Sequence, residues 1–365
     1  MRITFISPAL NMGGGTRVIG IHAEELQRRG HQVVIVSSSL PPISIRRKIK
    51  SLLRGRGWPK APVPSASHID DTDLVSHVLT TPYVTTDDVP DADVVIATWW
   101  QTAEWVDTFP PNKGVKVFYI QGHEVFPGQP TDRVEATWHL PFHKLTISDW
   151  LVDLAINKYG DPVVTKVPNA VDLEQFRAPP RGKQQHPTVG FLYTTSLVKG
   201  IDVCLETIAL LQQRISDLEV VCFGAHEPID EYPLPSGAVF THRPAQDAIR
   251  DLYASCDVWL CGSRSEGFHL VPTEAMACRC PVVSTKVGGP IDSIEEGVNG
   301  YLVDQEDVQA LARRVEHVLS LSQAEWKTMS DAAWSTASSY TWQQAGDLFE
   351  KALERFIEQG PRSDR

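Results

Sequence analysis

The chain has 365 residues, a length that suggests two domains, each large enough to bury its own core. Hydrophobic residues make up 42% and charged residues 22% of it, which excludes a disordered or fibrous protein. The formal net charge of −11 argues against a general nucleic-acid binder, because neutralising phosphates requires a dominant basic face. No signal-like leader precedes the first apolar run, and no window reaches the ~20 apolar residues of a membrane span. We therefore expect a cytoplasmic protein.

The first half of the chain alternates short apolar runs, rich in β-branched residues, with helical patterns. One helix is predicted from Thr16 to Arg29, closed by Gly30. This alternation is typical of parallel βαβ units. The predicted strands are Ile3–Ile6, Val33–Val36, Val94–Thr98 and Val115–Ile120.

A segment between the second and third predicted strands, residues 45–60, is rich in cations interleaved with apolar side chains. This composition is typical both of a solvated helix face and of a helix that lies on an anionic membrane surface. Both interpretations stay open. The cations are Arg46, Arg47, Lys48, Lys50, Arg54, Arg56 and Lys60, and the apolar residues are Ile45, Ile49, Leu52, Leu53 and Trp58.

Residues 179–187 are polar and interrupted by prolines, and are predicted to link two domains. The alternating pattern then resumes, so the sequence predicts an α/β protein with doubly wound domains over residues 1–178 and 188–340. A final helix is predicted at about residues 341–365. Ligands of such sheets bind beyond the carboxyl ends of the strands, so we expect a site in a cleft between the domains. The later predicted elements are strands Thr188–Leu192, Leu218–Phe223 and Val258–Cys261 and helices Ile201–Ile215 and Ala245–Cys256.

The segment Glu266–Ala277 carries the sharpest functional signal. It follows a predicted strand and opens a helix, so the N–H groups of Leu270 and Val271 lie at a helix N-terminus, where a pyrophosphate can bind. Glu266 in the loop and Glu274 in the helix can accept hydrogen bonds from sugar and ribose hydroxyls. Two glutamates at this spacing also occur on ordinary solvated surfaces, so spacing alone does not decide.

In its wider context this segment closely resembles the signature of glycosyltransferase family 4, and the resemblance covers nearly the whole chain. It implies the GT-B fold, in which two Rossmann-like domains face each other across a cleft and the C-terminal helix crosses back to the N-terminal domain. It also implies transfer from a nucleotide-diphosphate sugar with retention of the anomeric configuration. The further motifs that carry the resemblance are Cys280–Thr285, Val287–Pro290 and Glu295–Val303.

For the C-terminal domain the resemblance implies a set of donor contacts. Glu266 matches the family glutamate that holds the donor sugar, and Glu274 the one that holds the ribose. Lys199 resembles the lysine that neutralises donor phosphates, although the arginine that usually precedes it is absent. His269 stands where the family often has glycine. The remaining expected donor contacts are Gly224, Arg243, Phe268, Leu270 and Val271.

For the N-terminal domain the resemblance implies two further features. Asn11–Thr16 matches the family's glycine-rich loop, in which Gly14 and Gly15 let the backbone approach the donor or the acceptor closely. It is no dinucleotide fingerprint, because G-x-G-x-x-G is absent. His123 follows a predicted strand where the family often has a histidine facing the reacting sugar, and we assign it to catalysis together with Glu266 and Lys199. A structural histidine, with Glu124 as the acting residue, is the alternative.

The resemblance thus implies a retaining hexosyltransferase that moves a sugar from a UDP-, GDP- or dTDP-sugar to a glycan or lipid-linked acceptor in cell-surface polysaccharide synthesis. No cofactor and no metal are expected, because a helix dipole and cations can stabilise the leaving diphosphate. Two alternatives stay open: a nucleotide-sugar epimerase on the same scaffold, and a non-catalytic nucleotide-sugar-binding protein. Nucleic acid is not an expected partner. Peripheral contact at the inner face of the membrane would involve residues 45–60.

Overall fold

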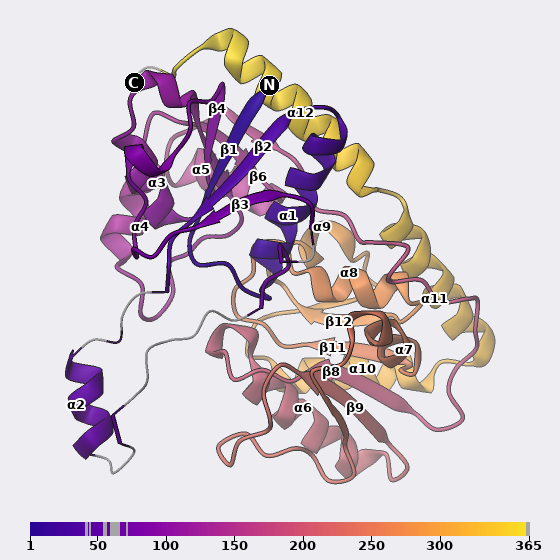
Figure 1. The fold of residues 1–365 in the computed structure, drawn as a ribbon. Helices are drawn as coiled ribbons and strands as arrows, with labels where there is room; N and C mark the ends of the chain where they lie inside the picture. Colours follow the sequence, from indigo (N-terminus) through magenta and orange to yellow (C-terminus); the bar gives the residue numbers. More distant parts are fainter. Residues whose placement is uncertain (41–42, 44, 54–56, 59–65, 71, 363–365) are drawn as a thin grey trace. The chain divides into compact units, whose positions relative to one another are not determined.

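The computed structural model describes residues 1–40, 43, 45–53, 57–58, 66–70 and 72–362. Its contacts divide the chain into two compact units, each built on its own sheet (Figure 1). Unit 1 comprises Met1–Ile147, Val152–Val167 and Gly346–Arg365, and unit 2 comprises Ser148–Leu151 and Pro168–Ala345.

Unit 1 contains a seven-stranded sheet in which all neighbouring strands are parallel, in the order β3-β2-β1-β4-β5-β6-β7. The order reverses between β1 and β4, which makes the sheet doubly wound. The strands are β1 (Arg2–Ser7), β2 (Gln32–Ser37), β3 (Val75–Val78), β4 (Val94–Ala97), β5 (Val115–Ile120), β6 (His143–Thr146) and β7 (Val164–Lys166). The helices are α1 (Gly14–Arg28), α2 (Ile45–Leu53), α3 (Trp100–Asp107), α4 (Thr131–Thr137) and α5 (Asp149–Asn157), the last of which belongs to unit 1 from Val152 onward.

The last helix, α12 (Trp342–Gln359), belongs to unit 1 from Gly346 onward. The ring of Phe349 lies 5.2 Å from that of Tyr119 in β5, measured between ring centroids. Arg29, which follows α1, donates a 2.8 Å hydrogen bond to Glu350. The predicted return of the C-terminal helix to the first domain is therefore confirmed.

A buried cluster of three charges fastens the segment after α12 to unit 1. Asp161 accepts a hydrogen bond of 2.7 Å from Lys144 Nζ and one of 2.8 Å from Arg362 Nη1. The pKa of Asp161 is well below its usual value: burial would raise it, but the hydrogen bonds and charges of Arg362 and Lys144 outweigh burial. The cluster therefore holds a carboxylate between two cations.

Unit 2 contains a six-stranded parallel sheet in the order β10-β9-β8-β11-β12-β13, which reverses between β8 and β11. The strands are β8 (Thr188–Leu192), β9 (Glu219–Gly224), β10 (Val239–His242), β11 (Val258–Cys261), β12 (Val282–Thr285) and β13 (Gly300–Val303). The helices are α6 (Ile201–Arg214), α7 (Ile249–Ala254), α8 (Leu270–Ala277), α9 (Pro290–Ser293), α10 (Val308–Ser320) and α11 (Gln323–Ser338).

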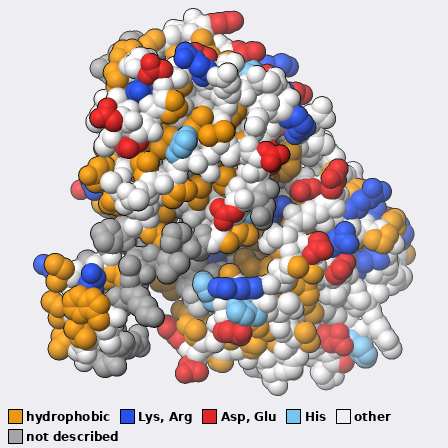
Figure 2. Space-filling model, viewed as in Figure 1, with side chains coloured by type: hydrophobic (Ala, Val, Ile, Leu, Met, Phe, Trp, Pro, Cys, Tyr) orange, Lys and Arg blue, Asp and Glu red, His pale blue; other side chains and the backbone are white. Residues whose placement is uncertain are grey.

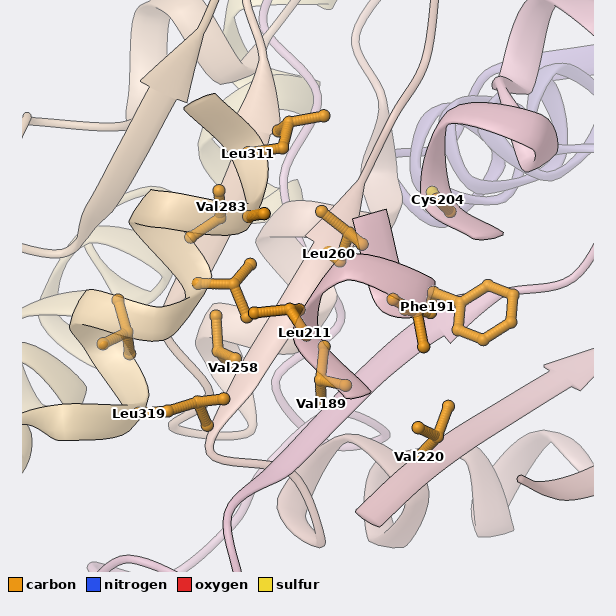
Figure 3. Close-up of a cluster of buried hydrophobic side chains, with 14 of the residues drawn as sticks. Val189, Phe191, Cys204, Leu211, Val220, Val258, Leu260, Val283, Leu311 and Leu319 are labelled. Atoms are coloured by element: carbon orange, nitrogen blue, oxygen red, sulfur yellow. The ribbon is translucent and has the colours of Figure 1, made fainter. Parts of the chain in front are cut away.

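Both faces of the second sheet are covered. Val258 and Leu260 of β11 join a buried cluster with residues of α6 and α10, part of which is drawn in Figure 3. Trp259 and Cys261, which alternate with them, join a second cluster with α7, α8 and α11. Side chains of a strand alternate between faces, so a strand buried on both faces is apolar throughout. All six cysteines are buried and free.

Residues 168–187 belong to unit 2, so the structural division at Val167 and Pro168 precedes the segment 179–187 that the sequence suggests as a linker. Phe176 packs in the core of unit 2. Within the suggested linker, Lys183 Nζ donates hydrogen bonds of 2.6 and 2.9 Å to the carbonyls of Leu319 and Leu321. The polar, proline-rich composition correctly indicates an irregular backbone, but the Lys183 side chain binds carbonyls at the C-terminal end of α10.

Candidate functional site

Most of the residues singled out in the second half of the chain gather at one edge of the sheet of unit 2. Lys199 follows β8, Gly224 ends β9, Arg243 follows β10, and the segment 266–271 follows β11. All these strands are parallel, so their carboxyl ends lie at the same edge. The loops after β8 and β11 flank the point where the strand order reverses, the usual ligand site of such sheets.

Lys199 and Glu266 form an ion pair at this reversal point. Lys199 Nζ lies 2.8 Å from the Glu266 carboxylate, which also accepts a 2.8 Å hydrogen bond from Ser263 Oγ. The Glu266 side chain is only 8% exposed, whereas that of Lys199 is 33% exposed. Burial would raise the pKa of Glu266, but its electrostatic interactions with His269 and Lys199 and its hydrogen bonds hold it below the ordinary value. Glu266 is therefore a carboxylate at neutral pH.

His269 is buried beside this pair, with Nε2 3.5 Å from Glu266 Oε1. Its backbone has a φ of +68°, a left-handed conformation that is unusual for a residue with a Cβ. Burial lowers the pKa of His269 to about 4, outweighing the opposite effect of Glu266. The imidazole is thus neutral at pH 7. The strained backbone of His269 is a feature often seen at functional sites.

The N-terminus of α8 opens next to these side chains. His269 is its N-cap residue and makes no side-chain cap, so the first amide groups, including those of Leu270 and Val271, have no partner from such a cap. Gly288 packs against the loop before the helix: a Cβ there would lie 2.7 Å from the Glu266 carbonyl, and its φ is +50°. The half-buried Phe268 lies in the same loop.

Glu274 lies one turn into α8 and is buried. Its carboxylate accepts a 2.9 Å hydrogen bond from the hydroxyl of Tyr253, a fully buried residue of α7. The bond fixes the rotamer of Glu274 from the core side. Sequence reasoning missed Tyr253, because it lies in an apolar helical pattern that gives no sign of a polar partner.

Gly224 and Arg243 lie together at the end of the β9–β10 pair. The Arg243 amide donates a 2.9 Å hydrogen bond to the Gly224 carbonyl, and its Nε donates one of 2.9 Å to the carbonyl of Ala225. The Arg243 backbone is also left-handed, with a φ of +46°. Arg243 is exposed, whereas Gly224 is buried at the end of β9.

In unit 1, the glycine loop leads directly into α1, whose first residues are Gly14 and Gly15. The loop is braced by Asn11, whose Oδ1 accepts a 2.6 Å hydrogen bond from the Gly13 amide. A Cβ on Gly15 would lie 3.7 Å from the Gln121 side chain, so the loops after β1 and β5 approach each other.

His123 and Glu124 follow β5 but have different environments. His123 Nε2 lies 2.7 Å from the Tyr159 hydroxyl, and burial lowers its pKa. Glu124 is buried and accepts a 3.0 Å hydrogen bond from the Trp100 amide at the start of α3. Burial raises the pKa of Glu124 well above its ordinary value. Both residues lie at the carboxyl edge of the unit 1 sheet.

No group of three or more His, Cys, Asp or Glu side chains among the described residues is arranged to hold a metal ion. Within the same part of the chain, no helix combines the length and the apolar run that a bilayer-spanning segment needs.

Comparison with known proteins places these residues in a family context. Residues 173–333 match the model of the family described as "Glycosyl transferases group 1", and this range includes Lys199, Glu266 and Glu274. D-inositol 3-phosphate glycosyltransferase of Corynebacterium urealyticum is 30% identical over 146 residues, which make up 36% of this chain and 34% of that protein. The matches span between 28% and 42% of the length of the first three curated relatives.

Two solved structures resemble nearly the whole chain. Sucrose-phosphate synthase from Thermosynechococcus elongatus has a TM-score of 0.73 at 16% identity, covering 98% of this chain and 100% of that one. HepE from Anabaena, in complex with UDP-glucose, has a TM-score of 0.72 at 18% identity, with coverage of 98% and 100%. At this identity the likeness shows the fold, and it confirms the predicted GT-B class of two Rossmann-like domains.

Proposed function

We propose that this protein is a glycosyltransferase that binds a nucleotide-diphosphate sugar through unit 2. The observation that carries the proposal is the ion pair of Lys199 with the buried Glu266, at the strand-order reversal and beside the uncapped N-terminus of α8. A cation, a carboxylate and amides without a side-chain cap lie together, and this combination suits a ligand with a diphosphate and sugar hydroxyls. The family match over residues 173–333 supports the same assignment.

The proposed donor contacts follow from this arrangement. The amides of Leu270 and Val271 and the ammonium of Lys199 bind the diphosphate, and Glu266 accepts hydrogen bonds from the sugar. Glu274, oriented by Tyr253, accepts those of the ribose. The base lies against the turn at residues 224 and 243, whose backbone groups suit uracil, guanine or thymine. The complex of the similar HepE with UDP-glucose supports a nucleotide-sugar ligand.

We infer direct transfer with retention, as in glycosyltransferase family 4. The bond from the anomeric carbon to the diphosphate oxygen breaks, and the acceptor oxygen bonds to the same face of that carbon. The acceptor proton passes to the departing diphosphate. Lys199 and the α8 amides stabilise the negative charge that develops on the leaving group. In unit 1, His123 orients the acceptor, and Glu124 is the alternative for that role.

No metal enters this mechanism, because Lys199 and the helix N-terminus supply the positive charge that a metal ion otherwise provides. The expected result is that transfer persists in excess EDTA. Loss of activity in EDTA, with recovery on adding Mg²⁺ or Mn²⁺, would contradict this part of the proposal.

The donor prediction is tested by a thermal-shift and hydrolysis screen against UDP-, GDP- and dTDP-sugars. One donor should stabilise the parent by ~2.7 kcal/mol at a concentration of 100 Kd. Glu274→Gln should abolish most of this shift, and Tyr253→Phe, which removes only the orienting hydroxyl, should reduce it. The shift of each variant is measured against its own melting temperature without ligand, so altered stability does not affect the comparison.

The same screen separates the alternative functions. Slow release of free sugar and nucleoside diphosphate supports the transferase. Interconversion of sugars without an acceptor indicates the epimerase, and binding without any turnover, even with acceptors present, indicates the binding protein. No stabilisation by any of the three donor classes would overturn the proposal.

We further propose that α2 contacts an anionic membrane, as suits an enzyme with a lipid-linked acceptor in polysaccharide synthesis. Its apolar side chains are exposed, with Ile45 72% and Leu53 83% accessible, and they gather over α2 in Figure 2. Lys48 Nζ lies 5.4 Å from the centre of the Trp58 ring. No Asp or Glu occurs between Glu25 and Asp70. Of the segment predicted for this contact, residues 54–56 and 59–60 lie outside the described residues.

Membrane contact is tested by sedimentation with phosphatidylglycerol-containing vesicles. The double variant Arg46→Glu, Lys48→Glu should bind at least about 30-fold more weakly, since each basic residue near an anionic surface contributes ~1 kcal/mol. Arg313→Glu, Lys351→Glu makes the same charge change elsewhere and should bind like the parent. A parent that binds these vesicles no better than pure phosphatidylcholine would refute the contact.

A further inference from the structure

Arg264 lies two residues before Glu266, and its guanidinium binds two carboxylates from different parts of unit 2. It donates hydrogen bonds of 2.9 and 2.7 Å to the two oxygens of Asp202, in the first turn of α6. It also donates one of 3.0 Å to Glu306, which follows β13. Such two-pronged contacts hold both partners in a fixed geometry.

Arg264 also binds the turn that carries Lys199. Its backbone amide donates a 2.8 Å hydrogen bond to the carbonyl of Val198, and its Nη1 donates one of 2.9 Å to that of Leu197. The loop after β8 and the loop after β11 are therefore joined twice, by Arg264 and by the Lys199–Glu266 pair. The close approach of these loops also requires Gly200, where a Cβ would lie 1.9 Å from the Gly262 carbonyl.

Glu306 is held in an unfavourable backbone conformation. Its φ is +64°, one of few positive values at a non-glycine residue among the described residues. A left-handed residue with a side chain persists where its surroundings hold it in place. Here the side chain of Glu306 is held by both Nε and Nη2 of Arg264.

Arg264 is not free to serve as the phosphate-binding arginine that the sequence lacks before Lys199. Its donors are occupied by two carboxylates and a carbonyl, and a phosphate would have to displace them. Two negative charges already neutralise one positive charge. The contacts of Arg264 are therefore better suited to holding the loops after β8 and β11 together than to binding an anion.

We propose that Arg264 is a positioning residue, which holds the Lys199 turn and the Glu266 loop together so that both side chains meet one ligand. The identity of that ligand rests on the proposed function. The fastening itself is a property of the ligand-free protein and can be measured without activity.

The test uses the full chain and four variants. Arg264→Met removes the guanidinium, Arg264→Lys keeps only its charge, and Asp202→Asn weakens one of its partners. Arg214→Met is the matched control, because Arg214 pairs with Glu316 in the same unit through a 3.0 Å contact that involves neither loop. Amide hydrogen exchange is measured in peptides covering residues 194–200 and 262–268, and binding of UDP, GDP and dTDP by calorimetry.

For Arg264→Met we expect exchange to accelerate in both peptides and the affinity for the nucleoside diphosphate to fall about 10- to 100-fold, the effect of losing charged hydrogen bonds. Arg264→Lys should recover part of the affinity, Asp202→Asn should lose part of it, and Arg214→Met should match the parent.

Three results would overturn the proposal. Unchanged exchange in either peptide would show that Arg264 does not join the loops. Equal acceleration throughout unit 2 would make it a residue of general stability. Tighter nucleotide binding by Asp202→Asn would identify Arg264 as a phosphate ligand released from its carboxylates. If the parent binds no nucleoside diphosphate, the proposed function fails, while the exchange data still decide whether Arg264 fastens the loops.

Discussion

Replacing Glu266 with glutamine should lower the rate of sugar transfer about 10²- to 10³-fold, the usual effect of removing one electrostatic contact at a reacting centre. The carboxylate is buried and balances the charge of Lys199. Glutamine has nearly the same shape but leaves that ammonium without its partner and cannot accept hydrogen bonds on both terminal atoms. The measurement is kcat and KM with the donor identified by the screen.

The control for this variant is Glu316→Gln, which neutralises a carboxylate on the surface of the same unit. It should retain the parent's kcat and KM. A Glu266→Gln enzyme with at least a third of the parent's kcat would remove Glu266 from the proposed mechanism.

The pH dependence offers a further check on the same group. The pKa of Glu266 lies below its ordinary value, and that of His269 is about 4, so neither changes its charge between pH 6 and pH 8. Donor binding should consequently vary little over this range. A titration step near pH 6.5 in donor affinity would show that a histidine changes charge during binding.

The largest effect on stability is expected from Asp161→Asn. The variant leaves the cations of Lys144 and Arg362, 2% and 13% exposed, without their carboxylate. Breaking such a buried pair typically costs about 3–5 kcal/mol. Urea unfolding of the parent and the variant, followed by tryptophan fluorescence, measures the difference in the free energy of unfolding.

The pH dependence of this difference has a definite sign. The pKa of Asp161 is lower in the folded chain than its unfolded value of 3.8. The carboxylate therefore stabilises the fold fully above about pH 4, and this contribution is lost as the pH falls through the folded pKa. The gap between parent and variant should narrow in acid.

A double variant tests whether the loss comes from unpaired charge. Asp161→Leu together with Lys144→Met removes both members of the pair and should destabilise less than Asp161→Asn alone, because no buried ammonium of Lys144 remains. If the double variant loses as much free energy of unfolding as Asp161→Leu and Lys144→Met lose together as single variants, the cluster contributes packing and not charge pairing.

The strands at the centres of the two sheets could be predicted from the sequence. Residues 115–120, 188–192 and 258–261 match their observed strands, because a strand that is largely buried is a mostly apolar run. Peripheral strands were missed: β3, Val75–Val78, is exposed throughout and has no comparable pattern. The helix predicted at 245–256 is a short 3₁₀ turn followed by α7.

The candidate site was predictable only in part. The sequence singles out Glu266 and Glu274 because they belong to a continuous motif at a helix start. It does not single out Tyr253 and Arg264, because their roles depend on partners distant in sequence, at Glu274 and at Asp202. Composition predicts a linker at the proline-rich stretch 179–187, because it does not show that Lys183 binds the end of α10.

The placement of α12 in unit 1 determines the order in which the two units can be completed during synthesis. Unit 2 is nearly continuous over 168–345, so all of its strands have been synthesised before the ribosome reaches the residues that complete unit 1. Phe349, which packs against Tyr119, and Arg362, which binds Asp161, are made only after unit 2. Unit 1, which is begun first, can therefore be completed only after unit 2 has been synthesised. A chain that ends before Gly346 would lack the contacts that α12 makes with unit 1.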